Sequence, residues 1–175
     1  MAKTFLGILF FSCVAWAQPL GVGLKLGVPA TDAFKVIQAQ SIANAQNLVW
    51  GPYLELNLPG GNSVEIDALR RKYTFGTLGT NSWEFPVVLK HRIGSGMARP
   101  YFEGGAAFSR LSDISLSTLK HRQNYGLVVG GGVEIKFLFL KLSPEVRYTT
   151  WAVRNFDGSL QTNRKQLAVL MGFGF

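Results

Sequence analysis

Apolar and polar residues alternate along most of this chain, and the alternation is strictest over the last ten residues. From Gln166 to Phe175, large apolar residues occupy every second position and mostly small residues lie between them. Because successive side chains of a β-strand point to opposite faces, this pattern predicts a strand with one large apolar face. A strand of about ten residues crosses a bilayer at a tilt, but the same strand also fits the core of a soluble β-sandwich.

The same alternation recurs in a series of segments separated by turn residues. The predicted strands are 20–28, 48–58, 63–75, 83–93, 100–111, 124–137, 139–151 and 165–175. Short links at 59–62, at 94–96 and near Leu138 alternate with longer polar loops at 29–47, 76–82, 112–123 and 152–164. Short turns at one end and long loops at the other are typical of outer-membrane barrels. The predicted fold is all-β, an eight-stranded antiparallel up-and-down transmembrane β-barrel.

Two local features refine this prediction. A short helical turn, capped near Thr31, is expected in the first long loop. Pro52, Pro86 and Pro144 fall within predicted strands, where each removes one hydrogen bond from the ladder. Bulges at Gly51-Pro52 and Ser143-Pro144 are expected to accommodate two of the prolines, whereas Pro86 has no such explanation from the sequence.

Alternation does not by itself distinguish a membrane barrel from a soluble lipocalin-like barrel, since one is the other turned inside out. The charges decide, because seven acidic and seven basic strand residues share the face opposite the large apolar side chains. A closed interior requires such a balance, since unpaired buried charges are costly. Glycines on this face leave room for long side chains in a narrow lumen. The predicted lumen ionic network comprises Lys25, Glu55, Glu65, Asp67, Arg71, Glu84, Lys90, Arg92, Glu103, Glu134, Lys136, Lys141, Glu145 and Arg147.

The first seventeen residues form the chain's longest apolar stretch. Lys3 gives a positive start, Phe5 to Val14 are apolar, and Ala15-Trp16-Ala17 is a small-x-small cleavage site, so a signal peptide at 1–17 and a barrel at 18–175 are predicted. Lipoprotein cleavage before Cys13 is a weaker alternative, because Phe10 stands where leucine is usual. Cys13 is the single cysteine, which leaves a mature chain without disulfides.

Several segments carry a resemblance to a known family. They include Gly51 to Leu56, Trp83 to Lys90, Arg99 to Gly105, Leu142 to Tyr148 and the terminal Phe175. The segments 64–69 and 130–134 add to it. The mature chain resembles the small outer-membrane β-barrels of Gram-negative bacteria, the OmpA/OmpX-like porin-family barrels. The resemblance implies an outer-membrane location. Because eight strands are an even number, both termini are expected on the short-turn side, in the periplasm. The resemblance also implies that Phe173 and Phe175 are the signal read by the barrel-assembly machinery.

The net charge of +8 has a local explanation that needs no nucleic acid. Nine cations belong to the long-loop side, and only Asp32, Asp113 and Asp157 oppose them there. The nine are Lys35, Arg70, Lys72, Arg110, Lys120, Arg122, Arg154, Arg164 and Lys165. Arg70, Lys72, Arg110 and Lys165 lie in outward register at strand ends, where they are predicted to bind lipopolysaccharide phosphates. A merely solvated basic rim is the alternative.

Aromatic residues are expected in two girdles, as transmembrane barrels have. Trp50, Trp83, Tyr125, Tyr148 and Trp151 are placed at the long-loop level. Phe137, Phe139, Phe173 and Phe175 are placed at the other level.

Candidate catalytic residues are few. His91 and His121 are the only histidines, they are predicted at opposite ends of the barrel, and neither has a serine two residues on or a neighbouring carboxylate. No cluster has metal-ligand spacing, so no cofactor is expected. The predicted role is structural or surface-interacting, in a monomer without catalysis. A lipid A-modifying enzyme and a narrow small-solute channel are the alternatives.

Overall fold

The computed structural model describes residues 20–30, 34–36, 43–75, 78–111, 123–152, 160–162 and 164–175. The predicted signal peptide lies outside these residues, as do His121 and the helical turn expected near Thr31. Phe34–Val36, in the same predicted loop, is a strand. Within the described part of the chain, no helix is both long and apolar enough to span a membrane.

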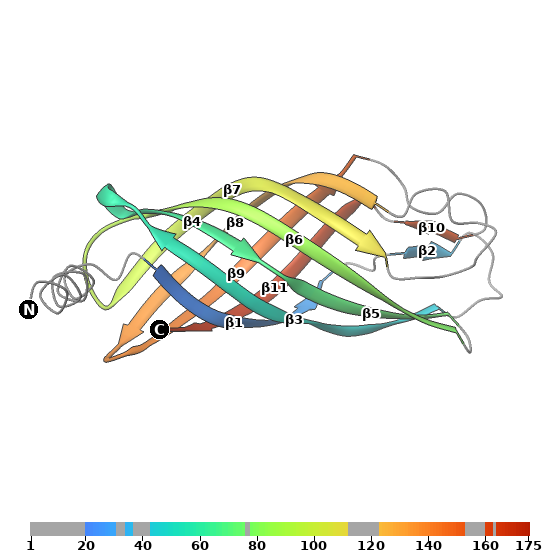
Figure 1. Ribbon diagram of the computed structural model, residues 1–175, viewed down its shortest axis with the longest axis horizontal. Helices are drawn as coiled ribbons and strands as arrows, with labels where there is room; N and C mark the ends of the chain where they lie inside the picture. Colours follow the sequence, from blue (N-terminus) through green and yellow to red (C-terminus); the bar gives the residue numbers. More distant parts are fainter. Residues whose placement is uncertain are drawn as a thin grey trace, which may run out of the picture.

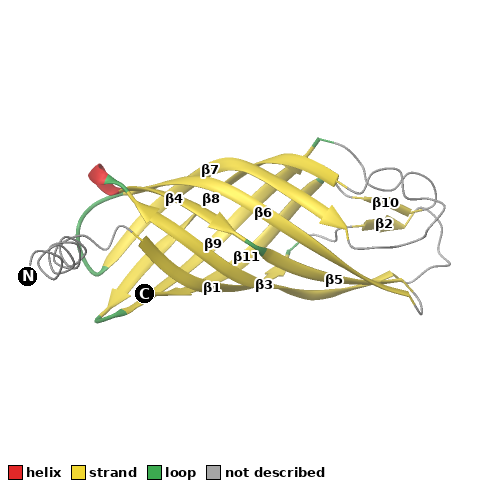
Figure 2. Ribbon diagram, in the orientation of Figure 1, coloured by secondary structure: helices red, strands yellow, loops and turns green. Residues whose placement is uncertain are grey.

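The chain forms one closed antiparallel sheet (Figures 1 and 2). β1 pairs with β3 on one side and with β11 on the other, and this double pairing closes the cylinder. The first half of the wall consists of β1 (Leu20–Pro29), β3 (Ala43–Asn57), β4 (Asn62–Asp67), β5 (Leu69–Phe75) and β6 (Leu78–Arg92). The second half consists of β7 (Ala98–Leu111), β8 (Gln123–Phe137), β9 (Leu140–Trp151) and β11 (Lys165–Gly174).

β4 and β5 are two parts of one wall strand, so the nine segments of the sheet make eight strands. Both parts lie between β3 and β6, and the pairing register is the same on either side of the break at Ala68. The eight-stranded up-and-down barrel predicted from the alternation is therefore confirmed, with one of its strands interrupted.

Prolines on both neighbours explain the interruption. In register, Pro52 of β3 lies opposite Ala68 and Pro86 of β6 lies opposite Asp67. Neither proline has an N–H to donate, so each removes one possible bond from the ladder, while the Ala68 N–H donates to the Pro52 carbonyl at 2.9 Å. The predicted bulges at Gly51-Pro52 and Ser143-Pro144 are wrong, because the register does not shift at either site. The ladder loses a bond instead of gaining a residue.

The two ends of the barrel differ in their connections. The short-turn end carries the links between β3 and β4, β6 and β7, and β8 and β9; the first contains the 3₁₀ turn η1 (Pro59–Gly61). The opposite, long-loop end carries a second small sheet, in which β2 (Phe34–Val36) pairs with β10 (Leu160–Thr162) (Figure 1). The predicted loop 76–82 is wrong, because β5 runs to Phe75 and β6 begins at Leu78.

The outer wall is apolar, whereas most of the buried side chains in the lumen are charged or polar. Along β1, for example, every second side chain from Leu20 to Val28 is exposed, whereas Lys25 between them is buried. Large apolar side chains are exposed on β1, β3, β4, β6, β7, β8, β9 and β11, and such a surface is what acyl chains cover in a membrane barrel.

An apolar layer crosses the lumen toward the long-loop end. Val88, Ala107, Val128 and Trp151 form one buried cluster. A second cluster joins Val49, Leu69 and Leu170 with Ala168 packed against it. The assignment of Trp151 to the outer girdle is therefore wrong: it is 2% exposed, because its odd number places it on the inward face that Arg147 shares.

Candidate functional site

Charged side chains from five strands meet at the middle of the lumen, on the short-turn side of the apolar layer. We call this set the central layer; it consists of Lys25, Glu65, Asp67, Lys90, Glu103, Glu145 and Arg147. Lys25 Nζ lies 2.5 Å from Glu65 Oε1 and 3.0 Å from Glu145 Oε1. Arg147 donates from Nη1 to Asp67 Oδ2 at 2.5 Å and from Nε to Glu103 Oε1 at 2.8 Å. Each cation thus joins carboxylates that come from different strands.

Lys90 occupies the one described group of carboxylates that has the spacing of a metal site. Oxygens of Glu65, Glu103 and Glu145 lie within 4.8 Å of one another. Lys90 Nζ is 2.7 Å from Glu65 Oε2 and 3.6 Å from Oε2 of both Glu103 and Glu145. The ammonium therefore supplies, from within the chain, the positive charge that a metal ion would otherwise bring.

Two tyrosines that the sequence analysis did not include complete this layer. The Tyr101 hydroxyl donates to Glu145 Oε2 at 2.7 Å, and Lys90 Nζ lies 4.7 Å from the centre of its ring. The Tyr53 ring lies between Lys25 and Lys141, at 5.5 and 5.4 Å from their ammonium nitrogens. Aromatic faces attract such cations, so the rings add to the attraction that holds the lysines.

A second charged set lies at the short-turn end, which we call the mouth layer: Glu55, Arg92, Arg99, Glu134, Lys136 and Lys141. Arg92 Nε donates to Glu134 Oε2 at 2.7 Å, and its Nη2 donates to Glu55. Lys141 also pairs with Glu55. Ser63 Oγ donates to Glu55 Oε1 at 2.6 Å. Glu55 and Glu134 therefore each accept bonds from more than one cation.

Arg99 and Lys136 differ from what the sequence predicted for this end. Arg99 was left out of the lumen set, yet it donates to Glu134, because β7 begins at Ala98 and brings residue 99 into the wall. Lys136 was included, but its side chain is 54% exposed and its Nζ is 3.9 Å from Glu134. The other thirteen predicted lumen residues have side chains no more than 12% exposed.

Arg71 and Glu84 lie on the long-loop side of the apolar layer, apart from the other charges. Arg71 Nη1 is 4.0 Å from Glu84 Oε1 and 3.1 Å from Gln166 Oε1. The predicted network is thus divided into a large part on the short-turn side of the apolar layer and a small polar part on its long-loop side. The charge pattern of the sequence does not predict an apolar layer inside the lumen.

Outward-facing cations and tryptophans alternate in one row across four neighbouring strands near the long-loop end. Trp50 of β3 pairs with Arg70 of β5, Arg70 pairs with Trp83 of β6, and Trp83 pairs with Arg110 of β7. We call these four residues the cationic row. Arg70 Nη2 donates to Asn81 Oδ1 at 3.0 Å, which fixes its guanidinium on the wall.

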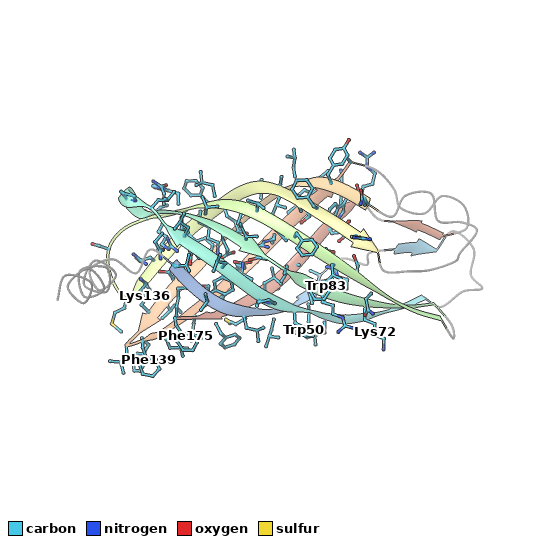
Figure 3. The ribbon with its side chains drawn as sticks, viewed as in Figure 1. Trp50, Lys72, Trp83, Lys136, Phe139 and Phe175 are labelled. Atoms are coloured by element: carbon cyan, nitrogen blue, oxygen red, sulfur yellow. The ribbon has the colours of Figure 1, made fainter. Side chains whose placement is uncertain are left out.

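The other two predicted rim residues lie outside this row. Lys72 is exposed one step nearer the long-loop end, as Figure 3 shows beside Trp50 and Trp83. Lys165 pairs with Thr150 on β9 and is not brought together with the row.

His91 lies on the outer face near the short-turn end, as the sequence analysis predicted. Its Nδ1 is 2.8 Å from Asn62 Oδ1, and its ring packs 5.2 Å from that of Phe102. These neighbours give the imidazole neither a nucleophile nor a carboxylate to work with.

Comparison with known proteins extends these observations. No protein-family model and no curated protein matches the chain. Among solved structures, the outer membrane protein OprG from Pseudomonas aeruginosa has a TM-score of 0.62 at 14% identity, covering 89% of this chain and 92% of OprG. Neisserial surface protein A (NspA) has a TM-score of 0.64 at 14% identity, with 89% and 96% covered. The outer membrane enzyme PagL has a TM-score of 0.50 at 15% identity, with 89% and 98% covered.

Identities this low carry information on fold and not on activity. The described strands form one closed sheet in which β1 pairs with β11, and each comparison matches nearly the whole length of an outer-membrane protein. The chain has the fold of the small eight-stranded β-barrel proteins of the bacterial outer membrane.

Proposed function

We propose that this protein is a monomeric outer-membrane barrel with a structural or surface-interaction role, whose cationic row contacts lipopolysaccharide. The observation that carries the proposal is the row itself, in which Arg70 and Arg110 flank Trp83 on the outer wall. A guanidinium binds phosphate through two parallel hydrogen bonds, and tryptophan prefers the membrane interface. Phosphorylated glycolipid in the outer leaflet meets both requirements.

The apolar wall and the terminal strand support the membrane placement. β11 exposes Val169, Met171 and Phe173 on the outer face, and Phe175 follows them. Under this proposal the signal peptide directs export, Phe173 and Phe175 are read by the barrel-assembly machinery, and the short-turn end with both termini faces the periplasm.

The side chains that occupy the lumen favour a closed plug over a pore. The central and mouth layers fill it with paired charges, and the apolar layer on their long-loop side presents no groups that could replace an ion's hydration shell. We therefore propose that the ionic network acts as a structural plug. Planar bilayers containing the protein are expected to stay silent, and steady conductance that disappears on heat unfolding would contradict the plug.

Lipopolysaccharide binding tests the proposed role. The double variant Arg70→Gln/Arg110→Gln is expected to weaken binding of the detergent-solubilised protein to lipopolysaccharide about tenfold or more, since bonds to charged groups contribute ~1.5 kcal/mol or more each. Dephosphorylated lipopolysaccharide should bind wild type and variant alike. Equal binding by wild type and double variant would contradict the proposal.

The same preparation tests the enzyme alternative. Lipopolysaccharide from cells with and without the protein is expected to have the same acyl-chain composition. A change in that composition would replace the structural role with a lipid A-modifying activity.

A further inference from the structure

The three turns at the short-turn end differ in the side chains that they expose. The turn after β6 exposes Ile93 and Met97, and the turn after β8 exposes Leu138 and Phe139, which are 86% and 77% exposed. The third turn, 59–61, contains one proline and two glycines instead. One side of this end is therefore apolar at its very tips, while the other side is not.

The apolar tips are continuous with the outer wall. The Lys136 N–H donates to the Met97 carbonyl at 2.7 Å, so the two turns are joined through the pairing of β7 with β8. Ile135 and Phe137 of β8 are exposed on the same outer face, immediately before Leu138. Exposed apolar side chains thus continue from the outer face of β8 onto the turns at this end of the barrel.

Excess positive charge lies beside these tips. The mouth layer holds four cationic side chains, Arg92, Arg99, Lys136 and Lys141, but only two carboxylates, Glu55 and Glu134. Arg92, Arg99 and Lys141 each lie within hydrogen-bonding distance of at least one of these carboxylates. Lys136 is the member left at the edge, half exposed, and it faces Lys141 directly across the ladder.

We propose that this edge is a binding site for an anionic phospholipid of the bilayer, with its phosphate on Lys136 and its acyl chains along Met97, Phe137 and Phe139. Figure 3 shows Lys136 and Phe139 together at the end of the barrel where Phe175 lies. Positive charge beside an apolar surface that continues the lipid-facing wall fits one amphiphile with a negative headgroup. The site rests on the membrane placement proposed above, but not on the cationic row at the opposite end.

Lipid retention tests the headgroup contact. Native mass spectrometry of the full-length protein with dioleoyl phosphatidylglycerol should show one retained lipid, and Lys136→Gln should weaken its retention about fivefold, corresponding to ~1 kcal/mol per lysine near anionic lipid. Lys72→Gln, an equal charge change at the long-loop end, should leave retention unchanged, and Lys136→Arg should preserve it. Equal losses for Lys136→Gln and Lys72→Gln would overturn the site in favour of general charge attraction.

A second measurement tests the apolar edge independently of Lys136. In a Cys13→Ser background, an environment-sensitive fluorophore on Phe139→Cys should be quenched by brominated phosphatidylcholine in vesicles, whereas one on Pro59→Cys in the polar turn should be quenched much less. Equal quenching at both turns would overturn the proposal. Unchanged lipopolysaccharide binding by the row variants, with these two results intact, would contradict the proposed function alone.

Discussion

The central layer and the apolar layer lie in the same lumen and share strands β6, β7 and β9, but ionic contacts hold the first together and apolar packing holds the second. β6 contributes Lys90 to the first and Val88, two residues away, to the second; β9 contributes Arg147 and then Trp151. In the central layer each long side chain is fixed by several oppositely charged partners. In the apolar layer large side chains pack against positions where a neighbouring strand has glycine.

The two layers should therefore fail in different ways. Removing one member of a buried ion cluster leaves the partner charges uncompensated in a poorly solvated interior. Removing part of a buried apolar side chain leaves a cavity, and adding a methyl group to a glycine there creates a clash. Substitutions at matched depth separate these costs.

The largest effect is expected in the central layer. Arg147→Met leaves Asp67 and Glu103 without their closest cation, and should lower the free energy of unfolding by about 3–5 kcal/mol. Urea unfolding in detergent micelles, followed by tryptophan fluorescence, measures this change. Lys72→Met on the exposed rim should alter it by less than about 0.5 kcal/mol. An unchanged unfolding midpoint for Arg147→Met would show that the central layer contributes no stability.

A smaller loss is expected in the apolar layer. Leu170→Ala empties space beside Val49 and Leu69, and should cost about 3 kcal/mol in the same unfolding assay. The neighbouring Val169→Ala changes a wall residue that faces outward, and should cost less than Leu170→Ala because no enclosed cavity forms. If the two variants lose equal stability, the layer inside the lumen is not packed as described.

The smallest effect is expected at a single glycine. A Cβ on Gly105 would collide with the Val87 carbonyl and lie 2.8 Å from Val88 Cα, so Gly105→Ala should cost about 2 kcal/mol. Gly104, next along β7, faces outward, and its nearest neighbour to a new Cβ is 3.9 Å away. Gly104→Ala should be close to neutral, and thermal midpoints from heat-modifiable gel migration compare the pair.

The sequence predicted the strands and the sides of the wall because a period of two carries both kinds of information. Glu145 and Arg147 are two residues apart, so whichever face takes one takes the other. The same rule, applied strictly, would have put Trp151 inside. It was placed in the outer girdle because tryptophan is common there, and that preference proved a poorer guide than position.

The partners within the lumen could not be predicted in the same way. Lys90 meets carboxylates from β4, β7 and β9, and this meeting depends on how far each strand is shifted against the next. The pattern does not place Arg99 in the lumen because it predicts a strand that starts at Pro100, whereas β7 begins at Ala98. The break at Ala68 cannot be predicted without the pairing register, which places Pro52 and Pro86 on either side of it.

The pairing of β1 with β11 also has a consequence for how the molecule is made. Gly23 lies opposite Gly174, so this seam joins residues from nearly the two extremes of the described chain. Until the final strand is available, both β1 and β9 would present unpaired backbone groups along a free margin, which invites pairing with other chains. Contacts between such distant residues also form slowly. A polypeptide truncated before Lys165 should therefore aggregate instead of inserting as a smaller cylinder.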